Sequence, residues 1–348
     1  MKKTIKTNRR QFLGTGLVAV SAAALLRSES VMAEEKAQES TQIKFSAFAD
    51  IHHYPGVFYS QTPEHLIKIQ ERAVKEKCDL IIHAGDFTHE PPKFMDFVNM
   101  YNDFKIPSYH CLGNHDQDGC AFEKSLECYH MPKGHYSFDK KGFRFIIFDP
   151  NYFCIDGVYT HYTKGNYFKA KTGMITAVPP EQIEWMKATM AESPYPCILV
   201  SHQSIERETG GVANWMDVRN AINEVNKKNP GRVRLCINGH HHRNFLRILD
   251  NVVYFDLNSA SYDWIEKRHN LYPGELCKQY SLIDHTVVYN DPVHAVITMD
   301  HNGLIKIDGM ESSMFMGIDR AKAKVSLYDT AGRPVVPKVS SANLRMIY

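Results

Sequence analysis

The sequence lacks a hydrophobic run long enough to cross a membrane comfortably. Its N-terminal apolar stretch, residues 13–26, is short and rich in small residues, whereas a membrane-spanning helix needs about 20 predominantly apolar residues. A basic segment precedes this stretch, and small residues at positions 31–33 offer a cleavage site. These features predict a signal peptide at residues 1–33. No cysteine lies near the cleavage position, so we expect no stable membrane anchor there.

Two adjacent arginines, Arg9 and Arg10, precede the apolar stretch and are followed by one polar and two apolar residues. This arrangement resembles a twin-arginine export signal. The alternative is an ordinary secretory signal with two incidental arginines. Both interpretations predict an exported protein, periplasmic or extracellular, with a polar linker at residues 34–42.

The sequence also lacks an excess of charge of either sign. The whole chain has 41 Lys and Arg residues against 39 Asp and Glu residues. Removal of residues 1–33 takes away six of the basic residues and one of the acidic residues, which leaves a net charge of −3. No basic stripe offsets this value, so we expect no nucleic-acid partner.

The cysteines lack the spacing of a metal-binding framework. All eight fall outside Cys-x-x-Cys pairs and zinc-finger patterns. Cys111, Cys197 and Cys236 lie in apolar strand-like runs, where cysteine usually behaves as a small buried hydrophobe. Export of folded protein would favour reduced thiols, whereas Cys120 and Cys128 lie in a loop region and could pair. The sequence leaves both possibilities open.

Residues of metal-ligand type follow five apolar, strand-like runs. These runs are residues 43–49, 80–84, 108–112, 197–200 and 233–237. The residues that follow them are, in order, Asp50 and His52, Gly85-Asp86, Gly113-Asn114-His115-Asp116, Ser201-His202, and Gly239-His240-His241-His242. Because residues after successive strands of an α/β sheet gather along one edge, we expect these side chains to meet. Carboxylates, imidazoles and a carboxamide together predict a metal site and a metalloenzyme.

The spacing within these clusters supports this interpretation. Asp50 and His52 are two residues apart, as are His240 and His242, so each pair can face one way on extended backbone. Asp86 follows a glycine that permits a tight turn, and its two carboxylate oxygens suit a bridge between two metal ions.

The order of the predicted elements indicates an α/β fold. The first three strands alternate with two amphipathic helices, which begin at Thr62 and at Pro91. The later elements are expected as a hairpin at 136–149, a long surface loop at 150–178, helices at 179–190 and 214–226, and strands at 245–249, 252–257, 280–289, 293–299, 304–307 and 322–328. No repeat of 20–50 residues is present, which predicts one domain at residues 43–310 and a β-rich tail at 311–348.

The five clusters resemble the five-block signature of the calcineurin-like metallophosphoesterases. The resemblance covers residues 50–242, with every block present and in order. It implies a four-layer α/β/β/α sandwich of two mixed sheets flanked by helices, with two metal ions (Fe, Mn or Zn) at the strand ends. In this family pattern Asp50, His52 and His242 hold one ion, Asn114, His202 and His240 hold the other, and Asp86 bridges them. His115 faces the substrate and Asp116 orients its imidazole.

One departure from related families concerns His89. Purple acid phosphatases have a tyrosine three residues after the bridging aspartate, where this chain has His89, so an iron–tyrosinate pair is not expected. His89 and His53 are candidates for contacts around the site. The alternative for each is a surface or packing role. Tyr54, Asn151 and Tyr152 lie in site-facing loops without a distinguishing pattern.

The resemblance implies a hydrolase of small phosphoric esters. Two adjacent cations would lower the pKa of a bridging water, whose hydroxide attacks phosphorus, and neutralise the phosphoryl oxygens. A protonated His115 would then supply a proton to the leaving oxygen. The alternatives are a phosphodiesterase for cyclic nucleotides or other diesters, and a metal-binding scaffold without activity. Substrate specificity is expected to lie in residues 150–178 and 203–231.

Overall fold

The computed structural model describes residues 42–59, 61–206, 210–329 and 332–348. Residues Ile43–Tyr348 form one compact unit. The predicted signal peptide lies outside the described residues, as does the predicted linker except for Gln42, which begins the first strand. Within the described residues, no helix is both long and apolar enough to cross a membrane.

One mixed sheet contains the three strands that the sequence places first. β1, β2 and β3 run parallel to one another, and β15, β16 and β17 run antiparallel at the other edge. The order across this sheet is β17 (Ala342–Arg345), β16 (Leu304–Asp308), β15 (Ala295–Asp300), β1 (Gln42–Phe48), β2 (Leu80–Ala84) and β3 (Ser108–Cys111).

The second mixed sheet has a parallel centre and an antiparallel strand at each edge. β5, β9, β10 and β12 are parallel, whereas β4 and β11 pair antiparallel with their neighbours. The order across this sheet is β11 (Phe245–Leu249), β12 (Val252–Asp256), β10 (Val233–Asn238), β9 (Cys197–Val200), β5 (Phe143–Ile147) and β4 (Tyr136–Lys140).

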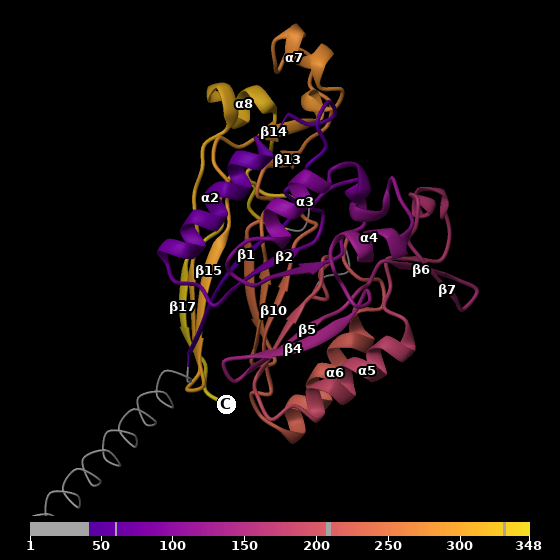
Figure 1. Cartoon of the computed structure of the whole chain (residues 1–348), viewed down its shortest axis with the longest axis vertical. Helices are drawn as coiled ribbons and strands as arrows, with labels where there is room; N and C mark the ends of the chain where they lie inside the picture. The colour runs from indigo at the N-terminus through magenta and orange to yellow at the C-terminus, as the bar shows by residue number, and fades with distance from the viewer. Residues whose placement is uncertain (1–41, 60, 207–209, 330–331) are drawn as a thin grey trace, which may run out of the picture. The chain divides into compact units, whose positions relative to one another are not determined.

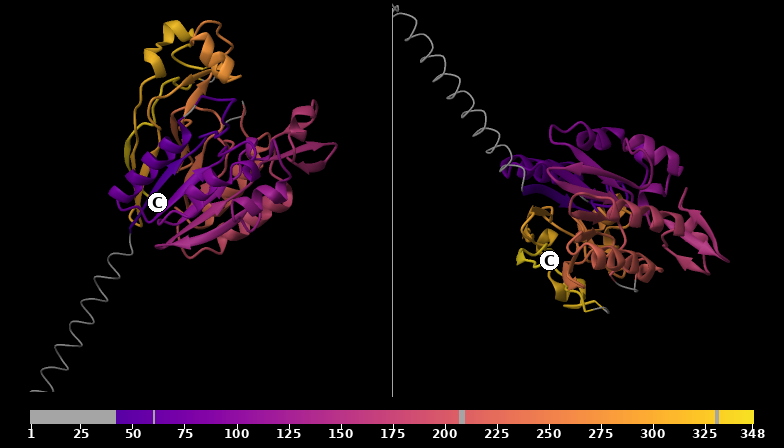
Figure 2. Two further views of the ribbon diagram at one scale, coloured as in Figure 1. Left: turned by 45° about the horizontal axis from the view of Figure 1, so that its top comes forward. Right: turned by 90° about the horizontal axis from the view of Figure 1, so that it is seen from below.

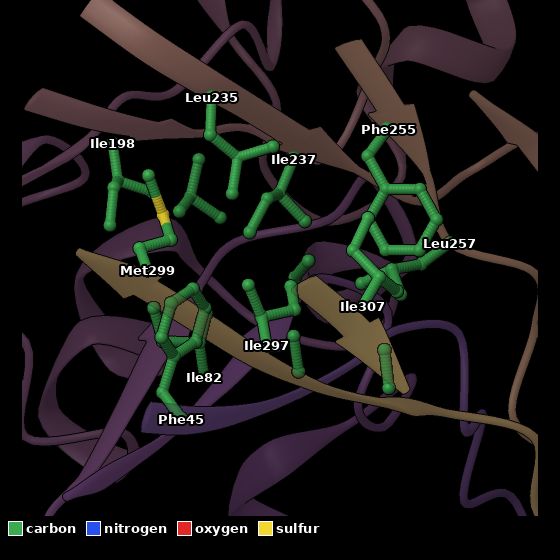
Figure 3. Packing of buried hydrophobic residues seen from close by; sticks show 14 of the residues in the cluster. Phe45, Ile82, Ile198, Leu235, Ile237, Phe255, Leu257, Ile297, Met299 and Ile307 are labelled. Carbon is green, nitrogen blue, oxygen red and sulfur yellow. The ribbon is translucent and has the colours of Figure 1, made fainter. Parts of the chain in front are cut away.

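The two sheets pack face to face around a buried apolar core. In Figure 3, Phe45, Ile297 and Met299 of the first sheet oppose Leu235 and Ile237 of the second. All five side chains are at most 1% exposed. Successive residues of a strand point to opposite faces, so one set of alternate apolar residues fills this space and the other set faces outward.

Helices cover the outer face of each sheet (Figures 1 and 2). α2 (Thr62–Lys75) and α3 (Met95–Asn102) pack on outward residues of the first sheet such as Phe48 and Ile81. α5 (Pro180–Ala191) and α6 (Trp215–Lys228) pack on the second sheet. The predicted four-layer α/β/β/α sandwich is therefore confirmed.

Several predicted elements differ from the structure. The region predicted as one helix from Pro91 is a 3-10 turn, η1 (Pro91–Lys93), followed by α3. Of the predicted strand at 280–289, only β14 (Thr286–Val288) is a strand, and it pairs with β13 (Tyr262–Trp264). The predicted strand at 322–328 is absent from the described chain, and its start belongs to α8 (Arg320–Ala323). In the segment at 280–289, a 3-10 turn at Ile283–His285 leaves only the last residues of the segment for a strand.

The region expected to be a surface loop contains a small sheet. In this sheet β6 pairs antiparallel with both of its neighbours. The strands of the sheet are β6 (Tyr152–Ile155), β7 (Val158–His161) and β8 (Met174–Ile175). The 3-10 turn η3 (Asn166–Lys169) lies between β7 and β8 in the chain. These strands have four, four and two residues, which is too short for a periodic pattern to stand out in the sequence.

The remaining short elements lie mostly near β13 and β14 and in the last forty residues. They are η2 (His115–Gln117), α4 (Phe122–Cys128), α7 (Gly274–Gln279), η4 (Ile283–His285) and η5 (Phe315–Gly317). The compact unit includes residues 311–348, and β17 completes the edge of the first sheet. All eight cysteines are unpaired, including Cys120 and Cys128.

Candidate metal centre

The carboxyl ends of five parallel strands bring the predicted ligands to one place. Asp50 follows β1, Asp86 follows β2, and Asn114 follows β3. His202 follows β9, and His240 follows β10. Since β1, β2 and β3 belong to one sheet and β9 and β10 to the other, the site requires both sheets to be packed together.

The backbone at these positions adopts a conformation that costs energy. Five candidate ligands have positive φ angles, a region that side-chain-bearing residues occupy rarely. They are Asp50 (54°), His52 (50°), Asp86 (59°), His240 (68°) and His242 (49°). Such strain persists where the surrounding structure imposes it, most often at functional sites.

Three glycines allow the chain to approach the ligands closely. A Cβ atom at Gly113 would lie 2.1 Å from Asp86 Oδ1, and one at Gly85 would lie 2.3 Å from His202 Nδ1. A Cβ atom at Gly239 would lie 2.4 Å from Asp50 Oδ2. Each glycine of the Gly-Asp, Gly-Asn and Gly-His pairs is therefore required because a side chain would occupy the space of a ligand.

Six of the seven predicted ligands form two adjacent clusters. Asp50, His52 and His242 form one, and Asp86, His202 and His240 form the other, with ligand atoms of each cluster within 4.8 Å of one another. His52 Nε2 lies 3.1 Å from His242 Nε2, and His202 Nε2 lies 3.0 Å from Asp86 Oδ2. Ligand atoms about 2.1 Å from one ion lie roughly 3–4 Å from one another, so these separations fit coordinated cations.

Asp86 is central to both clusters. Its Oδ2 atom lies 3.0 Å from His202 Nε2 in its own cluster and 3.8 Å from His52 Nε2 in the other. Its Oδ1 atom accepts a hydrogen bond from the backbone N–H of His115 (2.8 Å). This placement is the one that a bridging carboxylate requires.

Two histidines are oriented by backbone carbonyl groups. His202 Nδ1 lies 2.9 Å from the carbonyl oxygen of Ala84, and His242 Nδ1 lies 2.8 Å from that of Tyr262. A carbonyl oxygen accepts a hydrogen bond only from a ring nitrogen that carries a proton, so the opposite nitrogen, Nε2, is left to face the site. Ligand histidines are commonly held in this way.

The electrostatics of the buried cluster favour bound cations. Burial would raise the pKa of Asp86, but His202 and His115 outweigh it and hold the pKa well below its usual range. Burial lowers the pKa of His52 and of His240 to about 3, which keeps both imidazoles neutral and able to coordinate. His202 is the exception, because Asp86 and Asp50 outweigh its burial and raise its pKa to about 9. A proton there balances buried negative charge that metal ions would balance instead, so the donor set fits two cations.

The carboxamide of the seventh predicted ligand, Asn114, lies in a hydrogen-bonded setting. Its Nδ2 group donates to the hydroxyl of Tyr167 (3.2 Å), and its Oδ1 atom accepts from Gln203 Nε2 (3.4 Å). Gln203 also donates to Asn151 Oδ1 (2.9 Å), and Asn151 is fully buried. Asn151 therefore supports Asn114 through Gln203. The sequence does not distinguish this role from that of an ordinary loop residue.

The prediction that Asp116 orients His115 is wrong. The His115 Nδ1 atom lies 2.6 Å from Asp118 Oδ2. The Asp116 carboxylate instead accepts hydrogen bonds from Tyr129 OH and from the backbone N–H groups of Gly113, Asp86, Phe87 and Thr88. The Asp116 carboxylate therefore joins the loops after β2 and β3. Its two oxygens are already engaged by these donors, and it does not contact the His115 imidazole.

Asp118 forms a cluster with His89 and His115. His89 Nδ1 lies 3.1 Å from Asp118 Oδ2, and His89 Nε2 lies 3.0 Å from His52 Nδ1. His89 thus contacts the predicted ligand set directly. Asp118 was missed, although its position three residues after His115 in a helical turn is the spacing at which side chains meet.

The other candidates from the sequence differ in their distance from the site. Tyr54 stacks on His89 with ring centroids 4.9 Å apart. His53 stacks on Phe97 (4.0 Å) and therefore has a packing role. Tyr152 packs against His161 (4.4 Å) in the small sheet.

Two aromatic residues of β13 border the site without having been predicted. The Tyr262 ring lies 5.2 Å from that of His52, and the Trp264 ring lies 6.3 Å from those of His52 and His242. Their strand follows β12 by several residues and carries no motif, so no sequence signal points to this contact.

Two solved structures are similar to this chain. A dimetal phosphatase from Danio rerio aligns with 78% of this chain and 98% of its own, at 13% identity and a TM-score of 0.54. GAP50, the anchor in the inner membrane complex of Plasmodium, aligns with 82% of this chain and 93% of its own, at 13% identity and a TM-score of 0.48. At 13% identity, the likeness to the dimetal phosphatase shows the fold alone.

The sequence comparisons identify the family. A comparison with curated protein sequences gives no match. Residues 43–244 match the family described as calcineurin-like phosphoesterase. This match spans more than half of the chain and contains all the strands that supply the clusters, so the protein belongs to the calcineurin-like phosphoesterases.

Proposed function

We propose that the protein is an exported hydrolase of phosphoric esters that uses two metal ions. The observation that carries the proposal is the pair of adjacent carboxylate–imidazole clusters with Asp86 between them. Asp50, His52 and His242 hold one ion. Asn114, His202 and His240 would hold the other, and Asp86 would lie between the two.

The residues around the ions have separate tasks in this proposal. Two adjacent ions supply Lewis-acid activation of water and neutralise the phosphoryl oxygens. Their identity is Fe, Mn or Zn, since nitrogen and oxygen ligands suit all three. His115 donates a proton to the leaving oxygen as the ester bond breaks. Asp118 Oδ2 lies 2.6 Å from His115 Nδ1, and a carboxylate at this distance favours the protonated imidazole.

The test is a panel of phosphomonoesters and phosphodiesters on protein reconstituted with each of the three metals. We expect hydrolysis with about two ions bound per chain, measured by elemental analysis. Asp86→Ala should lose both occupancy and activity, because it removes a charge shared by the two cations. Two bound ions with no hydrolysis of any ester would favour a metal-binding scaffold, and a single tightly bound ion with full activity would refute the two-metal arrangement.

We propose further that export follows the twin-arginine route and delivers the protein to the periplasm or the exterior. The support is the pair Arg9-Arg10 before a short apolar stretch. Replacement of both arginines by lysine should leave the precursor in the cytoplasm, measured by cell fractionation. Normal processing of the double variant would instead indicate an ordinary secretory signal.

A further inference from the structure

A large apolar side chain is exposed next to the proposed general acid. Phe168 lies in η3 and is 63% exposed. Its ring centroid lies 6.5 Å from that of His115. Single exposed apolar residues are common on protein surfaces and usually need no explanation. Phe168 differs from these because hydrogen bonds and ring contacts fix the turn that carries it.

This turn is fixed to the loop that carries His115. The backbone N–H of Gly165 donates to the carbonyl of Gln117 (3.1 Å), and that of Lys164 donates to the carbonyl of Cys120 (3.0 Å). Gly165 has a φ angle of 62°, and a Cβ atom there would lie 3.1 Å from Phe168 Cδ2. The Phe168 ring therefore packs against Gly165, which leaves room for it because it has no side chain.

Tyr167 ties the same turn to the catalytic groups. Its hydroxyl donates to Asp118 Oδ1 (2.8 Å) and accepts from Asn114 Nδ2 (3.2 Å). Its ring stacks on the buried Tyr162 (4.3 Å) on one side and contacts Phe168 (4.3 Å). Asp118 is the carboxylate that pairs with His115, so hydrogen bonds of the neighbouring Tyr167 set the position of Phe168 relative to His115.

We infer that Phe168 stacks on a planar aromatic group in the alcohol part of the substrate. This inference rests on the proposed function, in which His115 protonates the leaving oxygen. Whatever lies beside His115 then lies beside the leaving alcohol. An aromatic face is favourable to another planar ring and offers no hydrogen bond to a small polyol. The substrate class is therefore a phosphoester whose leaving alcohol carries an aromatic ring, such as a nucleotide.

The test compares two esters that share the same leaving oxygen. Adenosine 5′-phosphate and 1-O-methylribose 5-phosphate both release the 5′ alcohol of a ribose and differ in the aromatic base. We expect the wild type to favour the nucleotide in kcat/KM by about tenfold or more, the scale of a base–aromatic stack. Phe168→Ala should remove most of this preference while leaving the sugar ester little changed, and Phe168→Tyr should keep the preference.

A matched control lies on the small sheet of β6–β8, next in the chain to the turn that carries Phe168. Val158 is 65% exposed at the turn end of β7, and Val158→Ala should leave the preference unchanged. Equal selectivity in the wild type and in Phe168→Ala, or an equal loss on both esters, would overturn the stacking role while the proposed hydrolase activity stands. Failure of the metal-loaded wild type to hydrolyse any ester on the panel would overturn the proposed function and this inference together.

Discussion

Asp116 and Asp118 are two residues apart and have different partners. Asp116 is fully buried and accepts from four backbone N–H groups and a tyrosine hydroxyl, so it stabilises the loops that supply Asp86 and Asn114. Asp118 is less buried and contacts His115, His89 and Tyr167. Loss of the Asp116 carboxylate should therefore affect the folding of the site. Loss of the Asp118 carboxylate should affect the proposed general acid, His115.

His115→Asn and Asp118→Asn are expected to lower turnover in a way that depends on the leaving group. An aryl ester such as nitrophenyl phosphate releases a stable anion and needs little protonation, so its kcat/KM should fall modestly. An alkyl ester releases a basic alkoxide, and its loss with His115→Asn should approach the ~10²–10⁴-fold typical of general acid catalysis. Asp118→Asn should show the same trend with a smaller loss of kcat/KM. The His115 imidazole is still present in this variant and lacks only the carboxylate that pairs with it.

His202→Asn is the control for this experiment. It removes a ligand, so both esters should suffer alike and metal content should fall. Metal content should be unchanged in His115→Asn and Asp118→Asn. An equal loss on both esters with metals intact would make His115 a phosphate-orienting group and would withdraw its role as the acid.

At the scale of elements, burial on both faces made the central strands predictable. β2 and β9 were predicted to the residue, because their buried runs are bounded by polar residues, glycine or proline. The ligand positions were predictable for the same reason, since each follows such a strand. β17 and the small sheet of β6–β8 were not, because each of these short strands has at most one buried residue. Tyr167 and Phe168 reach the site through that small sheet, so their contacts could not be read from the sequence.

The chain after β16 depends on close backbone packing at Gly309. A Cβ atom there would lie within 1.9 Å of the Val339 carbonyl oxygen, and the Gly309 N–H donates to Ser341 Oγ (3.1 Å). Gly309→Ala should push residues 339–341 away from β16 and weaken the pairing of β17. We expect a loss of about 1–3 kcal/mol in the free energy of unfolding, the usual cost of overpacking.

Thermal unfolding measures this effect, with Gly274→Ala as the matched control. A Cβ atom at Gly274 would meet no other atom within 4 Å, and this glycine has no positive φ angle, so its substitution should leave the melting temperature nearly unchanged. An unchanged melting temperature in Gly309→Ala would mean that the last forty residues contribute little to the stability of the unit.

For the whole molecule, stability is coupled to pH through buried histidines outside the metal-ligand set. His65 in α2 is 1% exposed, and burial lowers its pKa to about 4 even though Asp291 and Glu64 oppose the shift. His294 before β15 is 1% exposed, and burial with the nearby Arg72 lowers its pKa to about 3. Both imidazoles are neutral in the folded protein, whereas an unfolded chain binds a proton near pH 6.5.

This difference fixes the direction of the pH dependence. Below about pH 6.5 the unfolded state binds more protons than the folded state, so stability is full above that value and falls as the pH drops toward 4. Each such histidine contributes a slope of about 1.4 kcal/mol per pH unit, or about 2 kcal/mol between pH 6.5 and 5. The measurement is the free energy of unfolding in denaturant at several pH values from 5 to 8.

His294→Gln isolates one of these contributions, because glutamine does not titrate. Whatever the absolute stability of this variant, its slope between pH 6.5 and 5 should be shallower by the contribution of one proton. His301→Gln, at an exposed turn, should leave the slope unchanged. Comparing each variant with the parent at the same metal concentration removes the contribution of protons that compete with metal for the ligand histidines. An identical slope in His294→Gln and the parent would show that His294 is not kept neutral by the fold, and the acid sensitivity would then have to come from other buried groups such as His65.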